Sequence, residues 1–195
     1  MGSERGKMKI HNNGGEVIYE DESPTIKETV EAAVDQKVSL RYANLYDANL
    51  RSANLRNADL RNANLRNVNL YKAELTNVDL SGSDLTKAKL CFAKLRGAIL
   101  TKADLNYSDF YNAGLAGAIL PEKTFVFTDF WTVLIHRERI KIECQEHSVE
   151  EWLSFTDEQI TAMHSPALAW WVRNKPLIYG ICKSFGWVKR KGKYD

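Results

Sequence analysis

The sequence predicts a mainly β fold: a right-handed, four-sided (quadrilateral) parallel β-helix of about four coils over residues 38–120. Two observations predict it. A large apolar residue stands at every fifth position from Leu40 to Leu120, 17 times without a break, and a small residue precedes nearly every one by two positions. A period of five fits neither an α-helix nor a β-strand, because neither would gather these side chains on one face. The chain must therefore turn once per repeat, with both residues pointing inward.

Four such turns close a square coil of about 20 residues, and stacked coils hydrogen-bond at the strand spacing of roughly 4.8 Å. The small residue is needed because large and small side chains share one narrow interior at crystal-like density. We therefore expect a large side chain at Ala58 or Ala63 to overpack the interior, at a cost of about 1–3 kcal/mol or more.

The repeats themselves carry a resemblance. ANLYD, ANLRS, ANLRN and ADLRN are similar to the A(D/N)LXX signature of pentapeptide-repeat proteins, and the similarity covers about 80 of the 195 residues. It implies the β-helix with high specificity. It implies little about function, because a fold does not by itself define an activity.

The square coil predicts columns of outward side chains twenty residues apart. One column is Arg51, Tyr71, Cys91 and Tyr111, flanked by Phe92. Aromatic side chains in such a column are expected to be covered, either by the chain's own C-terminal tail or by a partner or second copy. The predicted partner-binding residues are Arg51, Tyr71, Phe92, Tyr111 and Trp187.

The balance of charged residues disfavours two classes of function. The formal net charge is +2, and residues 38–120 hold 11 Lys or Arg against 7 Asp or Glu. Arginines 51, 56, 61 and 66 would form a girdle around the rod, interpreted as solvated side chains. This surface disfavours both mimicry of DNA, which needs closely spaced negative charge, and nucleic-acid binding, which needs a continuous basic track. Three widely spaced cysteines and the lack of a membrane-length apolar run predict a cytoplasmic protein.

Residues 1–37 form the first predicted region. Met1 to Lys7 is interpreted as a leader, with Met8 as the natural start. A short strand is expected at Glu16–Tyr19, and a helix at Pro24–Lys37 with Ser23 as its N-cap and Pro24 at its first position. A helix laid over the first coil would cover its open edge, so we expect an N-terminal capping helix.

Residues 121–195 form the last predicted region, a small α+β tail. Phe125–Ile135 and Arg139–Cys144 predict a strand pair, and Ser148 with Glu151 and Thr156 with Gln159 predict two capping boxes. A third helix is expected after Ser165-Pro166, with an interruption at Pro176. The predicted tail core is Trp152, Leu153, Phe155, Ile160, Met163, Leu168, Trp170 and Trp171.

The tail also carries a looser resemblance. The stretch CQEHSVEEW, followed by FTDEQI, is similar to the C-terminal part of small pentapeptide-repeat proteins of bacteriophages and prophages. That similarity implies a bacterial or phage-infected cell and control of a host system. Residues 177–187 are interpreted as a docking or homodimer surface, as part of the tail core, or, with the basic residues up to 193, as a membrane-surface segment. Ile99 and Ile119 are expected to lie under the tail.

Little in the sequence indicates chemistry. Cys144 and His147, with His164 or Cys182, have the residue types of a zinc site, but core packing is the favoured interpretation. We predict no catalytic residue, no metal and no cofactor. The predicted function is a non-enzymatic protein-binding module that acts on a bacterial host protein. The alternative is a DNA-mimicking gyrase inhibitor or an anti-defence protein.

Overall fold

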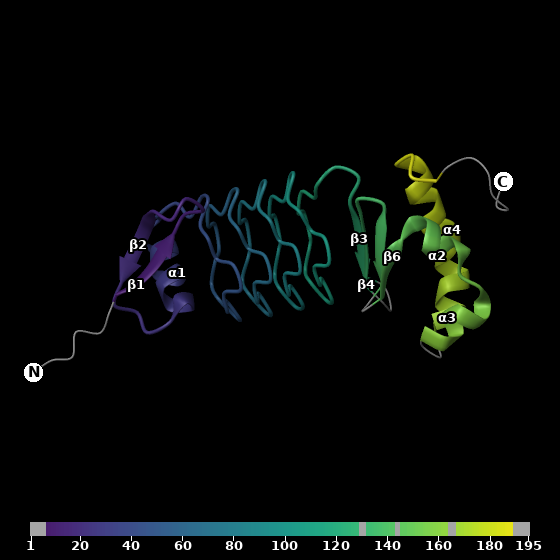
Figure 1. The fold of residues 1–195 in the computed structure, drawn as a ribbon, viewed down its shortest axis with the longest axis horizontal. Helices are drawn as coiled ribbons and strands as arrows, with labels where there is room; N and C mark the ends of the chain where they lie inside the picture. Colours follow the sequence, from purple (N-terminus) through teal and green to yellow (C-terminus); the bar gives the residue numbers. More distant parts are fainter. Residues whose placement is uncertain (1–6, 129–131, 143–144, 164–166, 189–195) are drawn as a thin grey trace, which may run out of the picture.

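The computed structural model describes residues 7–128, 132–142, 145–163 and 167–188. Figure 1 shows four parts in chain order: a hairpin with one helix, a stack of coils, a small sheet, and a group of helices at the far end. The stack of coils, called the rod below, positions every surface discussed here.

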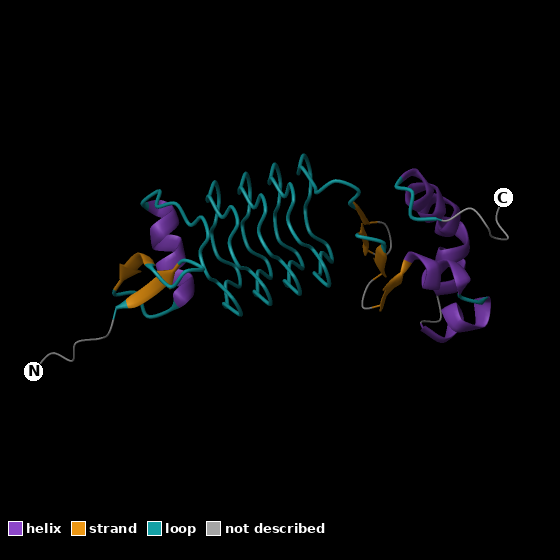
Figure 2. Cartoon of the chain, turned by 45° about the horizontal axis from the view of Figure 1, so that its top comes forward, coloured by secondary structure: helices purple, strands orange, loops and turns teal. Residues whose placement is uncertain are grey.

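The rod is built from coils that pair through single β-bridges. Parallel bridges join residues twenty positions apart, beginning with Asn44–Asn64 and ending with Ile99–Ile119. Each repeat also donates backbone hydrogen bonds to the next coil, for example from Leu60 N to Asp79 O at 2.8 Å. The paired segments are too short to count as strands, so Figure 2 draws the rod as loops. The twenty-residue offset is the one predicted from the period of five.

The interior of the rod holds the large and small residues together. Every leucine of the series from Leu40 to Leu105 is buried, and Phe110 follows in the last coil. Ser83 and Ser108 replace the usual small apolar residue, and both hydroxyls are buried. Each donates to a carbonyl three residues earlier, Leu80 O at 2.7 Å and Leu105 O at 2.6 Å. The hydroxyls are therefore tolerated in the interior because they are hydrogen-bonded.

Each corner of the coil depends on one backbone conformation. The second residue after each large residue has φ between 50° and 70°, from Tyr42 through Gly117. This left-handed region suits glycine and asparagine, and a bulky residue there is unusual. At Gly82 an added Cβ would lie 2.4 Å from Asn62 Oδ1 of the previous coil, so the glycine is also required by space.

The rod is preceded by β1 (Met8–His11), β2 (Val17–Asp21) and α1 (Ile26–Asp35). His11 O accepts a hydrogen bond from Asn44 N at 2.7 Å, which joins β1 to the first coil. The expected N-cap was wrong. Thr25, not Ser23, accepts from Glu28 N as the N-cap of a helix that begins at Ile26, and the Ser23 hydroxyl donates to Asp21 Oδ2 at 2.7 Å. Pro24 therefore precedes the helix.

A four-stranded antiparallel sheet follows the rod in the order β3 (Phe125–Thr128), β4 (Thr132–His136), β5 (Arg139–Ile142) and β6 (Gln145–Ser148). The predicted single strand over Phe125–Ile135 is a hairpin instead. All five residues of β4 are buried because the sheet is covered on both faces. Leu134 packs with the rod interior, whereas Val133 and Ile135 pack with the helices.

The helices are α2 (Val149–Ser154), α3 (Asp157–Met163) and α4 (Ala167–Ser184). Both predicted capping boxes are present, at Ser148–Glu151 and Thr156–Gln159. The predicted interruption at Pro176 is wrong, because α4 continues through it. Ile140 and Ile142 are buried as expected, whereas Cys144 lies outside the described residues. Among the helices that the structure describes, none is both long and apolar enough to cross a bilayer.

Candidate functional site

A ladder of aromatic rings runs along one corner of the rod. Tyr71 and Phe92 meet edge to face with ring centroids 5.6 Å apart, and Phe92 and Tyr111 do so at 5.5 Å. At the N-terminal end of the ladder, the Arg51 guanidinium carbon lies 4.2 Å from the centroid of the Tyr71 ring. We call Arg51, Tyr71, Phe92 and Tyr111 the aromatic column. The structure thus brings together four of the five predicted binding residues.

The aromatic column is open to solvent. Phe92 is 40 % exposed and Tyr111 is 39 % exposed, although both belong to a continuous run of rings. The tail, as far as it is described, therefore leaves the column uncovered. Ile119 is likewise 53 % exposed, which contradicts the expectation that the tail covers it. The aromatic column is therefore a candidate contact surface.

Phe92 joins the column although its backbone has a conformation that is unfavourable for a bulky residue. Its φ is 59°, in the left-handed region that Asn and Gly occupy at most other corners. The predicted column ran through Cys91 instead. Cys91 is half-buried, and burial together with the neighbouring Asp109 raises the pKa of its thiol to about 12. Its thiol is thus held protonated at neutral pH, and Phe92 supplies the ring that joins Tyr71 to Tyr111.

Two cations lie beside the Tyr71 ring at the N-terminal end of the aromatic column. Lys72 Nζ lies 5.3 Å from the Tyr71 ring centroid, so two cations share one aromatic ring. Neither Arg51 nor Lys72 forms an ion pair with any described residue. On the next side, by contrast, Glu74 pairs with Lys94 at 2.6 Å and with Arg56 at 2.9 Å, and both bonds hold its carboxyl pKa below the usual value.

Trp187, the fifth predicted residue, lies in the tail. It is partly buried in the tail's apolar cluster and meets Phe185 edge to face with ring centroids 4.9 Å apart. Lys123 Nζ donates to Phe185 O at 3.1 Å and holds this end of the tail near the chain that leaves the rod. Trp187 is therefore part of the tail core and not of the aromatic column.

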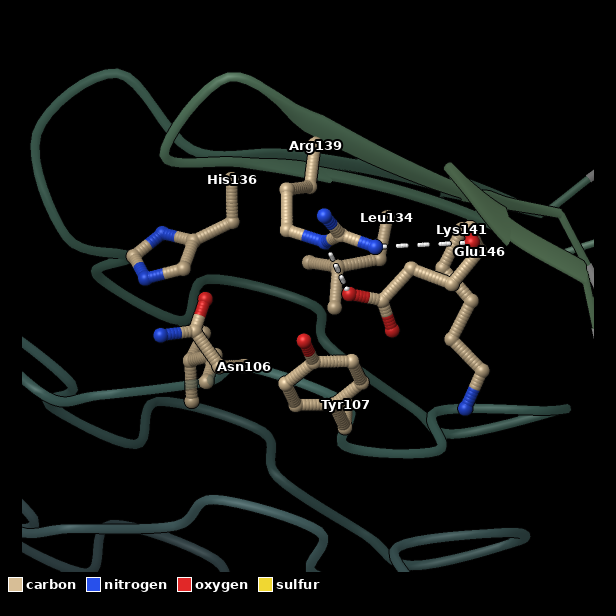
Figure 3. Close-up of a pocket in the computed structure, with 8 residues that line it drawn as sticks. Asn106, Tyr107, Leu134, His136, Arg139, Lys141 and Glu146 are labelled. Carbon is tan, nitrogen blue, oxygen red and sulfur yellow. Dashed lines mark hydrogen bonds and ion pairs between the residues drawn. The ribbon is translucent and has the colours of Figure 1, made fainter. Parts of the chain in front are cut away.

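A second candidate is a small pocket at the seam between the last coil and the sheet (Figure 3). Its lining residues are Leu105, Asn106, Tyr107, Leu134, His136, Arg139, Lys141 and Glu146. Arg139 pairs with Glu146 at 2.7 Å and lies over the Tyr107 ring at 5.4 Å. Lys141 Nζ donates to Ser108 O at 2.9 Å. Most of its charged groups are thus already engaged in joining the tail to the rod.

His136, which lines the same pocket, is buried at 5 % exposure. Nδ1 lies 2.7 Å from Thr124 Oγ1, and no described residue is hydrogen-bonded to Nε2. Burial lowers the pKa of His136, and the charge of Arg137 lowers it further against the opposing effect of Asp104. This seam was not predicted from the sequence, although basic and apolar residues alternate in β5.

The proposed zinc ligands are only partly described. Cys144 and His164 lie outside the described residues. Cys182 is fully buried in the tail core, where burial raises its thiol pKa to about 11. His147 packs edge to face against Phe155 at 4.9 Å. Among described residues, no three His, Cys, Asp or Glu side chains are grouped as metal ligands.

Comparisons with known proteins identify the five-residue repeat as that of pentapeptide-repeat proteins. The family model described as Pentapeptide repeats (8 copies) matches residues 43–82 and 83–121. A crystal structure of alr5209, a pentapeptide repeat protein from Nostoc PCC 7120, is 35 % identical over 50 % of this chain and 86 % of that chain, with a TM-score of 0.45. No curated protein sequence matched this chain.

This chain matches a smaller share of two further crystal structures. HetL from Nostoc sp. strain PCC 7120, described as involved in heterocyst differentiation regulation, is 36 % identical over 40 % of this chain and 39 % of its own, with a TM-score of 0.25. Rfr23 from Cyanothece 51142 is 34 % identical over 40 % of this chain and 56 % of its own, with a TM-score of 0.27. This chain therefore spans less than two thirds of either protein.

Proposed function

We propose, since this chain belongs to the pentapeptide-repeat family, that it is a non-enzymatic protein-binding module whose contact surface is the aromatic column. The observation that carries this proposal is the run of touching, partly exposed rings with an arginine at one end that forms no ion pair with any residue the structure describes. Aromatic and arginine side chains supply most of the energy at protein interfaces. A rigid rod holds them in place before binding, which lowers the entropic cost of association.

The finer description of the fold is part of the proposal. We infer a right-handed quadrilateral helix of about four coils, with regions divided at residues 37 and 120 and with α1 as the N-terminal cap. The bridges between residues twenty apart support the square coil. The burial of Val30 and Ala33 of α1 in the same cluster as Leu40 supports the capping role.

The setting proposed for this binding is a bacterial cytoplasm, with a host protein as the partner and a phage-type origin for the chain. The similarity of the CQEHSVEEW and FTDEQI segments to phage-encoded repeat proteins is its only support. A homodimer through the tail is a separate proposal, supported by Val172 and Leu177 of α4, which are 60 % and 51 % exposed. Sedimentation velocity tests the dimer, and a monomer across micromolar concentrations would refute it.

The binding proposal is tested by affinity capture from bacterial lysate with quantitative mass spectrometry. The test variant replaces Tyr71, Phe92 and Tyr111 with serine. The control replaces Tyr42 and Tyr46 with serine, because these tyrosines are 48 % and 57 % exposed on other corners. We expect the natural chain and the control to enrich the same protein and the test variant to lose it. Enrichment of that protein by all three would refute the role of the column.

The DNA-mimic alternative receives no support from the surface charge of the rod. Its carboxylates are mixed with cations: Arg61 binds Asp59 at 2.7 Å, and Arg66 lies 3.7 Å from Asp84. Such pairs neutralise the negative charge that would imitate a duplex. A gyrase supercoiling assay checks this alternative, and we expect no inhibition at micromolar protein.

A further inference from the structure

The four girdle arginines are not equivalent. Three of them pair with a carboxylate that lies 18 residues further along the chain, on the next coil. Arg56 reaches Glu74 at 2.9 Å, Arg61 reaches Asp79 at 3.5 Å and Arg66 reaches Asp84 at 3.7 Å.

The fourth arginine, Arg51, breaks this pattern. The residue 18 positions after it is Asn69, which is neutral. Its guanidinium lies on the Tyr71 ring, and more than a third of the Arg51 residue surface is exposed. The rod therefore provides a carboxylate to every girdle arginine except the one that begins the aromatic column.

The two ends of the aromatic column have different charged neighbours. Lys72, beside Tyr71, is a second cation without an ion pair to any described residue, and exposed Lys89 is bridged to Asn69 from the next coil. Asp109 stands near the other end, beside Cys91 and Tyr111. At that other end Lys141 also acts on Cys91, but its Nζ is bonded to Ser108 O at 2.9 Å, whereas the two cations at the Arg51 end form no ion pair with a described residue.

We propose that the column binds a protein segment that carries a carboxylate next to an aromatic or apolar side chain. The carboxylate binds Arg51 in the way that Glu74 binds Arg56, and the adjacent side chain packs on Phe92 and Tyr111. This inference rests on the proposed function and names the chemistry of the partner. Arginine and a carboxylate can form two parallel hydrogen bonds, which gives geometric specificity as well as energy.

The same surface is poorly suited to single-stranded nucleic acid, the other anionic polymer with aromatic groups. Bases bind by stacking on open ring faces along a basic groove. In the column, neighbouring rings already meet edge to face at 5.5 and 5.6 Å, which leaves no slot between them for a base. A protein segment with one or two carboxylates matches the two cations better.

The Asn69→Asp variant tests the proposal without removing a contact residue. It supplies an internal carboxylate at the position from which Asp79 and Asp84 bind their arginines, so it competes with the partner for Arg51. The turn should accept it, because Asn69 Oδ1 accepts from Tyr71 N at 3.1 Å just as Asp79 Oδ1 accepts from Ser81 N at 3.0 Å. Asn64→Asp is the matched control, because Tyr46, not an arginine, stands 18 residues before Asn64.

The probe is a fluorescein-labelled random copolymer of glutamate and tyrosine, with binding measured by fluorescence anisotropy. We expect Asn69→Asp and Arg51→Ala each to weaken binding by about tenfold, the change that corresponds to one charged hydrogen bond of about 1.4 kcal/mol. Asn64→Asp should bind as the natural chain does. Raising the salt concentration should weaken binding to the natural chain more than to Arg51→Ala.

Three results would overturn the proposal: no binding of the copolymer to the natural chain, equal affinity of Asn69→Asp, or tighter binding of an oligothymidylate with the same dependence on Arg51. These failures are separable from failure of the proposed function. If the triple-serine variant loses the captured protein while Asn69→Asp retains it, the column binds protein but not through a carboxylate on Arg51.

Discussion

The elements before and after the rod contact it in different ways. At the N-terminal end, Val30 and Ala33 of α1 are fully buried in the apolar cluster of the rod. At the C-terminal end, Leu134 is buried in this cluster and Val126 packs against it partly buried, and polar contacts are added, including an ion pair between Arg137 and Asp104 at 2.6 Å. Apolar burial stabilises an interface more than exposed ion pairs do. We infer that α1 folds with the rod, whereas the tail is docked on it and is more easily separated.

The largest expected loss of stability comes from a substitution in α1, at the apolar end of the rod. Val30→Asp would place a carboxylate where the natural side chain is fully buried, and we expect a loss of about 3–4 kcal/mol in the free energy of unfolding. Urea denaturation of the whole chain measures it. Val34→Asp, at a partly buried position of the same helix, should cost clearly less. Equal losses would show that α1 does not close the rod by burial.

A smaller effect is expected at the polar end from Lys141→Met. Lys141 Nζ donates to Ser108 O, the carbonyl that would bond to the next coil if the rod continued. Removing a charged donor from this carbonyl should destabilise the docked tail by about 1.5–3 kcal/mol. Hydrogen exchange should show faster opening in β4 and β5 and little change in coils near Leu60. Faster exchange throughout the rod would contradict a separable tail.

The polar end should also depend on pH through His136. Its pKa is lowered by burial, so the folded seam favours the neutral ring. The stabilisation of the folded seam by neutral His136 is fully present above the ordinary pKa of about 6.5 and is lost as the pH falls below that value. We expect the urea midpoint of the tail to fall between pH 7.5 and 5, and His136→Gln to flatten that dependence. An unchanged slope in His136→Gln would rule out this residue as the titrating group.

The smallest effect is expected from Arg137→Ala at the same seam. Its ion pair with Asp104 is exposed, with 55 % of the arginine side chain and 27 % of the aspartate side chain open to solvent. Such pairs contribute about 0.2–1 kcal/mol and are screened by salt. A double-mutant cycle with Asp104→Ala at low and high salt measures the coupling. A coupling well above 1 kcal/mol would show that the seam is stronger than its exposure suggests.

The rod was largely predictable because its geometry is local. One turn in every five residues fixes which side chains point inward, and a twenty-residue coil then fixes which outward side chains are neighbours. The column was therefore predicted except for one register change, in which Phe92 replaces Cys91 in the ladder. The missing partner of Arg51 was also readable in the sequence, as Asn69 in place of an acidic residue.

The ends were less predictable because their contacts are distant in the sequence. Nothing near Met8 shows that β1 pairs with the first coil through Asn44. The N-cap was predicted at Ser23, but the hydroxyl of Ser23 donates to Asp21, which lies outside the helix. The length of α4 was underestimated because packing of Trp171 and Ile178 in the tail core outweighs the local cost of Pro176.

Every surface inference depends on residues twenty apart being stacked neighbours, and cross-linking tests this most directly. Ser81 and Thr101 have side-chain oxygens 3.0 Å apart on adjacent coils. In a Cys91→Ser background, Ser81→Cys with Thr101→Cys should form a disulfide on mild oxidation, detected by peptide mapping, because stacked residues lie within the Cα range that a disulfide allows. Ser81→Cys with Asn106→Cys, on the next corner, should not. Preferential cross-linking of the second pair would contradict the twenty-residue coil and the aromatic column built on it.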